Sequence, residues 1–300
     1  MLARMELPAI QSFLRDRQID TWLVYDFRGS NPILAQLLPG QRWTTRRAML
    51  VIPAQGEAHI IVHNIDAPQF AACGFARRIY NTWQQWQQFV REATQCEGAS
   101  GNTIAMEYSP LGELPAVSFV DGGTLDFIRS LGVEVVSSED AIQFAVARWS
   151  PDALTKHHHA ATITAGAKDS AFKLIRKLLA ANESITEYGV QQHILKHLTD
   201  AGLDPDHPPI VGVNEHSGDP HYEVPATGSS PIRRGDWVLI DLWARVPGNG
   251  NVFADITWMA FCGDRVPDEH RRVWEAVKTA RDAAFTKVVD AWNTKTPVHG

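Results

Sequence analysis

The chain has 300 residues, of which 44% are hydrophobic and 21% charged, and its formal net charge is -6 at pH 7. This length exceeds what one hydrophobic core usually supports, so we expect two domains of an ordinary folded protein. The acidic balance argues against a nucleic-acid partner, and the apolar runs are too short to span a membrane.

The first half of the chain alternates between helix and strand patterns. It begins with an apolar helical pattern instead of a secretory signal, which predicts a cytoplasmic protein. Strands are predicted at 21–27, 47–53, 57–64, 102–108 and 133–138, and helices at 7–18 and 121–132. This alternation predicts one compact α/β domain over residues 1–148.

The character of the sequence changes near Arg148, where we place the start of a second domain over residues 149–300. Ser150 followed by Pro151 is typical of the start of a long helix. A second helix is predicted from Ser184, with Glu187 three residues later as its capping-box partner. Strands are predicted at 208–225, 233–244 and 252–261, and a last amphipathic helix at 267–292.

Two of these strands each carry one aspartate within an apolar run, Asp241 and Asp255. Because strand residues alternate between faces, a turn centred on Gly248 places the two aspartates directly opposite each other on one face. Two such carboxylates among apolar residues repel each other and lose hydration. A shared proton or divalent cations would remove the conflict. The alternative is a different register, in which one aspartate faces solvent or caps a turn.

His221 lies twenty residues before Asp241, so it could occupy a neighbouring strand. A lone histidine beside aromatic residues is more often structural. Next to a metal held by carboxylates, it becomes a candidate for holding a substrate carbonyl or moving a proton.

Taken in order, these segments resemble those of the pita-bread metallopeptidases, which include Xaa-Pro aminopeptidases, prolidases and creatinase. The stretches "IVGVNEHSGDPHYEVP", "RRGDWVLIDLWA" and "FADITWMAF" carry the resemblance. It implies an α/β class fold: a creatinase-type N-terminal domain, followed by a truncated pita-bread domain of α+β type with a curved antiparallel sheet.

The resemblance also implies a metallopeptidase that hydrolyses short peptides, of Xaa-Pro aminopeptidase or dipeptidase type. Asp241 and Asp255 would bind two divalent metal ions, manganese first, with cobalt or zinc as alternatives. His221 would be the catalytic residue that contacts the substrate, and the protein would form a homodimer. The alternatives are a non-peptidase relative, such as a creatinase-like amidinohydrolase or a lyase, and a metal-free binding module.

The chain departs from the family pattern in several places. Trp243 stands where the family usually has glycine, and Trp258 stands where most members have arginine. The turn between the aspartates is longer. Three further ligands of the family, one histidine and two glutamates, are expected from a second half of the domain. The chain is therefore expected to be the front part of a longer protein.

Overall fold

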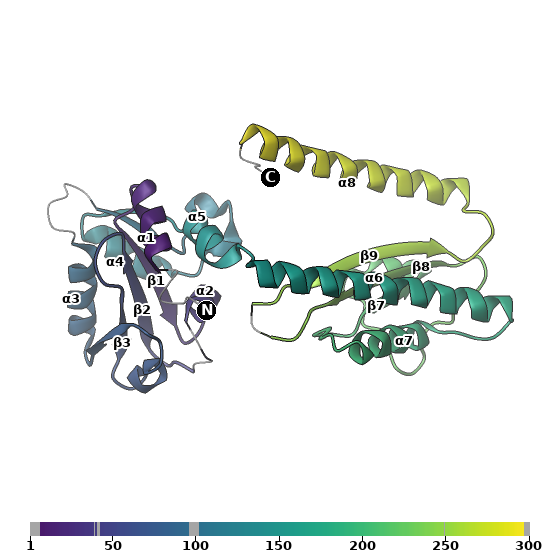
Figure 1. Cartoon of the computed structure of the whole chain (residues 1–300), viewed down its shortest axis with the longest axis horizontal. Coiled ribbons are helices and arrows are strands. Elements are labelled where there is room, and N and C mark those ends of the chain that lie inside the picture. The colour runs from purple at the N-terminus through teal and green to yellow at the C-terminus, as the bar shows by residue number, and fades with distance from the viewer. Residues whose placement is uncertain (1–6, 39, 41–42, 96–101, 249, 297–300) are drawn as a thin grey trace. The chain divides into compact units, whose positions relative to one another are not determined.

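The computed structural model describes residues 7–38, 40, 43–95, 102–248 and 250–296 (Figure 1). The chain divides into two compact units, Met1–Trp149 and Ser150–Gly300. In the described part of the chain, no helix combines the length and the apolar character that crossing a membrane requires.

The first unit is built on a six-stranded mixed sheet with strand order β4-β3-β2-β1-β5-β6. The β1–β2 and β2–β3 pairs are antiparallel, and the β3–β4, β1–β5 and β5–β6 pairs are parallel. The strands are β1 (Thr21–Phe27), β2 (Arg47–Pro53), β3 (His59–His63), β4 (Ala76–Tyr80), β5 (Thr103–Met106) and β6 (Glu134–Ser137). Strand β4 was not predicted, because its residues are mostly exposed and polar.

Helices cover both faces of this sheet, because its central strands are apolar on both sides. Trp22 and Val24 of β1 pack into one buried cluster, and Leu23 and Tyr25 into the other. The helices are α1 (Leu7–Asp16), α2 (Pro32–Leu37), α3 (Trp83–Thr94), α4 (Gly122–Ser130) and α5 (Glu139–Ile142). Short helical turns lie at Ala67–Phe70, Pro110–Gly112, Pro115–Val117 and Gln143–Ala147.

Glu107, which follows β5, is completely buried in the first unit. Its carboxyl group accepts hydrogen bonds from Trp22 Nε1 at 2.7 Å, Asn31 Nδ2 at 2.9 Å and Ser138 Oγ at 3.1 Å. Burial nevertheless raises the pKa of Glu107 to about 7, because the removal of water disfavours the charged form more than these hydrogen bonds favour it.

The stability of the first unit is therefore expected to depend on pH. The pKa of Glu107 is higher in the folded than in the unfolded chain, so its contribution is complete below about pH 4.5 and is lost as the pH rises through about 7. The loss is on the order of 3 kcal/mol. Hydrogen exchange of the Trp22 indole N–H in urea would measure it, and Glu107→Gln should remove this part of the pH dependence. An unchanged dependence in the variant would contradict the assignment.

The second unit combines helices with a three-stranded antiparallel sheet, β7-β8-β9. Its strands are β7 (Ile210–Val213), β8 (Trp237–Ala244) and β9 (Ala254–Phe261), and its helices are α6 (Pro151–Ala180), α7 (Glu187–Asp200) and α8 (Asp268–Thr294). Ser150 caps α6 as predicted, since its Oγ accepts a hydrogen bond from Ala153 N at 3.0 Å.

One face of this sheet is buried against α6 and α7. Val238, Ile240 and Leu242 of β8 share a core cluster with apolar residues of both helices. The α6 residues in that cluster are mainly alanines, which allow the helix to lie close to the sheet (Ala160, Ala167, Ala171). The other face of β8 is only half-buried, and it carries Asp241.

Candidate metal centre

The β8–β9 hairpin brings Asp241 and Asp255 to the same face of the sheet. Asp241 lies opposite Thr257, and Asp255 lies opposite Trp243. The two aspartates are thus diagonal neighbours across the strand pair, for which typical separations are about 7–8 Å. Both strands alternate regularly, so both carboxylates point away from the core against α6 and α7.

The predicted direct pairing of Asp241 with Asp255 is wrong. The register differs by two residues, because Asp241 pairs with Thr257. The strands end at Ala244 and resume at Ala254, so the connection is longer than the tight turn expected around Gly248. Asn251 closes this connection, because its Nδ2 donates to Val246 O at 3.1 Å and to Pro247 O at 3.0 Å. Asn249, part of the predicted turn, lies outside the described residues.

The two carboxyl groups differ in their surroundings. Asp241 Oδ1 accepts a hydrogen bond from Thr257 Oγ1 at 2.5 Å. Asp255 is exposed as a residue, but partial loss of hydration at its carboxyl group, with a smaller contribution from the charge of Asp241, raises the pKa of that group above its ordinary value. The loss of hydration and the mutual repulsion expected for the pair are thus both present at Asp255. A nearby cation would relieve this conflict.

The donor set fits a hard divalent cation in its chemistry, since carboxylate oxygens suit manganese, magnesium, cobalt or zinc. The carboxylates of Asp241 and Asp255 form this donor set on the shared face of the hairpin. Among the described residues, no group of three or more histidine, cysteine, aspartate or glutamate side chains is arranged to hold a metal.

His221 lies in a loop, and the prediction of a strand over 208–225 is wrong beyond Val213. Asn214 has a φ of 52°, a left-handed conformation that ends the extended backbone, and the short helical turn η5 (Asn214–Gly218) follows. The side chain of His221 is exposed. Its backbone N–H donates to Asp219 Oδ1 at 2.9 Å, which closes a local turn.

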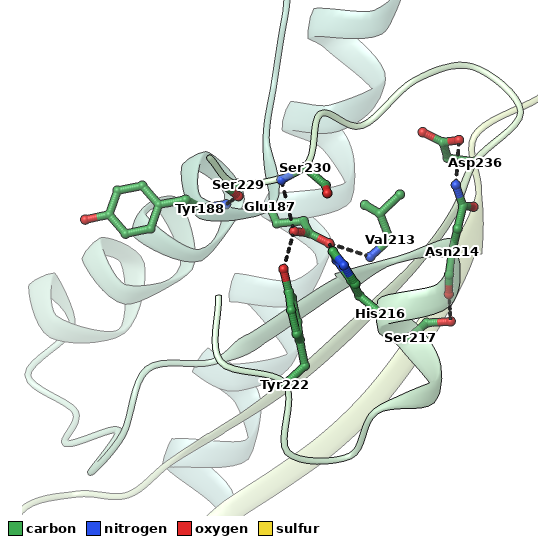
Figure 2. Close-up of polar contacts among 10 residues, drawn as sticks. All are labelled: Glu187, Tyr188, Val213, Asn214, His216, Ser217, Tyr222, Ser229, Ser230 and Asp236. Atoms are coloured by element: carbon green, nitrogen blue, oxygen red, sulfur yellow. Dashed lines mark hydrogen bonds and ion pairs between the residues drawn. The ribbon is translucent and has the colours of Figure 1, made fainter. Parts of the chain in front are cut away.

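Glu187 has a role in this unit that its position in the sequence does not predict. The helix begins later than predicted: Thr186 is the N-cap, since its Oγ1 accepts from Gly189 N at 3.2 Å. Glu187 is therefore the first helical residue and not a capping-box partner of Ser184. Its side chain is fully buried and accepts hydrogen bonds from the segment around His221 (Figure 2). A glutamate at a helix start is commonly explained by the helix dipole, so its type alone gave no signal.

The two tryptophans that depart from the family pattern occupy different faces. Trp243 is the direct cross-strand neighbour of Asp255, so its indole lies beside the carboxylate pair. Trp258 is on the opposite face, where Lys168 Nζ lies 4.2 Å from its ring centre. Of the two, only Trp243 can shape what approaches the aspartates.

The fold and the carboxylate pair together define a domain of pita-bread metallopeptidase type. A family model described as "Metallopeptidase family M24" matches residues 155–295. Over these residues, the second unit is similar to metallopeptidase family M24. A comparison with curated protein sequences finds no match.

Solved structures with the same fold include several peptidases. Prolidase from Thermococcus sibiricus has a TM-score of 0.60 at 17% identity, with 95% of this chain and 72% of that chain covered. Dipeptidase PepE from Mycobacterium ulcerans has a TM-score of 0.61 at 20% identity, with 88% and 66% covered. X-prolyl aminopeptidase from Caenorhabditis elegans, described as a cytosolic enzyme with a di-nuclear active site, has a TM-score of 0.56 at 14% identity, with 88% and 42% covered. The predicted fold class is thereby confirmed.

Proposed function

We propose that the protein is a metal-dependent peptidase that acts on short peptides, of the Xaa-Pro dipeptidase or aminopeptidase type. The observation that carries the proposal is the placement of Asp241 and Asp255 on one face of the hairpin of an M24 domain. The names of the similar solved structures, which are prolidases, dipeptidases and Xaa-Pro aminopeptidases, support the substrate class.

In this proposal, Asp241 and Asp255 hold two divalent ions, with manganese as the first choice and cobalt or zinc as alternatives. A divalent ion at this place supplies Lewis-acid activation of water and of the peptide carbonyl. His221 contacts the substrate near the scissile bond. The aspartates share their face with half-buried apolar side chains, which suits a small organic ligand held by a few polar groups (Leu239, Trp243, Met259).

The direct test is a substrate panel assayed on the full chain with manganese, cobalt, zinc or a chelator. We expect cleavage of Xaa-Pro dipeptides or of short peptides with proline in second position, dependent on added metal. Cleavage of a creatine-like molecule without peptide cleavage would instead support a non-peptidase relative. The absence of turnover with every metal would favour the metal-free binding module.

We further propose that the protein forms a homodimer through its first unit and acts in the cytoplasm. Large apolar side chains are exposed on this unit, among them Trp43 at 79%, Ile65 at 59% and Leu111 at 95%. Light scattering at micromolar concentration should give twice the chain mass of 33.3 kDa. A mass of one chain would contradict the dimer.

A further inference from the structure

We propose that Glu187 is a positioning residue for His221: its buried carboxylate fixes the segment 213–230, and Tyr222 transmits this constraint to the neighbouring histidine. The inference rests on the proposed function only for what His221 does to a substrate. The structural constraint itself can be measured without metal or peptide.

The carboxylate of Glu187 is completely buried. Burying a carboxylate is costly unless hydrogen bonds replace its water, so its partners must be in place whenever the unit is folded. Because Thr186 already caps α7, the side chain of Glu187 is free to turn inward. It thereby joins α7 to a segment more than twenty residues away in the sequence.

Four donors from separate parts of that segment converge on this one carboxylate (Figure 2). Oε1 accepts from Val213 N at 2.8 Å and from His216 Nδ1 at 2.7 Å. Oε2 accepts from the Tyr222 hydroxyl at 2.8 Å and from Ser230 N at 3.2 Å. The contacts thus lie at the end of β7, in η5, beside His221 and before β8, so one group holds the whole loop.

Tyr222 is the link between Glu187 and His221. Its ring stacks on the imidazole of His216, with 4.2 Å between ring centres and 25° between planes. Burial, together with the hydrogen bond to Glu187, raises the pKa of Tyr222 to about 12, so its hydroxyl remains a donor throughout the neutral range. His221 is therefore held on one side by its anchored neighbour and on the other by the Asp219 turn.

A purely structural role for Glu187 would stabilise the second unit without affecting His221 in particular. The two roles differ in what the mildest change does. Tyr222→Phe removes one hydroxyl and leaves the other three donors on Glu187. Tyr188→Phe is a matched control, because Tyr188 is the next residue of α7 and its ring points away from the carboxylate in Figure 2.

The experiment compares these variants by NMR, with urea unfolding to report global stability. The reporter is the imidazole carbon–hydrogen signal of His221, assigned with His221→Ala, together with amide exchange of residues 216–222. In Tyr222→Phe we expect a shifted or broadened His221 signal and exchange that is faster by about tenfold or more, as for loss of a hydrogen bond to a charged group. Tyr188→Phe should leave both unchanged.

Glu187→Gln should give the same local changes to a greater extent, because an amide nitrogen would face donors where an oxygen now accepts. If that variant does not fold, Tyr222→Phe decides the question. A His221 signal and exchange rates identical to the parent in Tyr222→Phe would overturn the inference.

Failure of the inference and failure of the proposed function give different results. If the His221 signal responds but no peptide is cleaved with any metal, the positioning role stands and the peptidase proposal falls. If peptides are cleaved but the signal does not respond, the reverse holds. In an active preparation, Tyr222→Phe should lower kcat more than it raises KM, since a misplaced His221 affects the reacting bond more than overall binding.

Discussion

Replacing Asp255 with asparagine is expected to abolish most metal-dependent peptidase activity while leaving the fold intact. The variant keeps nearly the same size but loses the charge that would hold the metal. Loss of a residue that merely supports a metal ligand typically costs about 10- to 100-fold in affinity or activity, so loss of a ligand should cost about 1000-fold or more.

The same substitution is expected to leave the free energy of unfolding of the metal-free protein unchanged or slightly higher. The pKa of Asp255 is raised by partial loss of hydration and by the charge of Asp241, so its ionised form is disfavoured in the metal-free fold. Asparagine at this position removes that conflict. Urea unfolding would measure the stability, and calorimetric titration with manganese would measure the metal affinity independently of any substrate.

Asp264→Asn makes the same chemical change at an exposed position just after β9 and serves as the control. It should bind manganese like the parent. Equal manganese affinity in Asp255→Asn and Asp264→Asn would reject the assignment of Asp255 as a ligand. The stability measurement would still report whether the two carboxylates repel each other.

Replacing Gly212 with alanine is expected to give the largest loss of stability in the second unit. Gly212 lies in β7 opposite Leu239. An added Cβ would lie 2.9 Å from the carbonyl carbon and oxygen of His216 and 3.0 Å from Ser217 N. These are backbone atoms, so η5 must move as a whole, and His216 must move with it. Overpacking together with a weakened bond to Glu187 should cost about 3 kcal/mol or more.

Gly218→Ala is the matched control for this prediction, because it adds the same methyl group six residues later, where no atom lies within 4 Å. Urea unfolding of both variants would measure the difference. Similar stability of the two variants would show that η5 can shift at little cost. The constraint from Glu187 would then be weaker than the structure indicates.

The side-chain alternation of β8 and β9, together with an even cross-strand offset, was sufficient to predict that both aspartates lie on one face. The pairing of individual residues was not predictable, because it depends on the connection that Asn251 closes with its side chain. Such side-chain hydrogen bonds within the connection leave no periodic signal in the sequence.

The role of Glu187 could not be predicted from the sequence either. Its partners His216 and Tyr222 are 29 and 35 residues away and follow no spacing rule. Helix-start statistics favour glutamate for local reasons, and these hide a tertiary role. The strand prediction over 208–225 failed for a related reason, since the left-handed conformation of Asn214 ends β7 and allows the loop to fold back onto α7.

The register of the hairpin has a consequence for how this domain tolerates insertions and deletions during evolution. Its observed register differs from the expected one by two residues, and both aspartates therefore remain on the same face. Two residues added to either strand change the depth of the hairpin and preserve that face. One residue added without a compensating bulge would turn Asp255 to the face of the sheet that packs against the buried alanines of α6. Its charge would be buried there without a partner. Length variation between the two aspartates is therefore expected to occur in steps of two, or within the connection at 245–253.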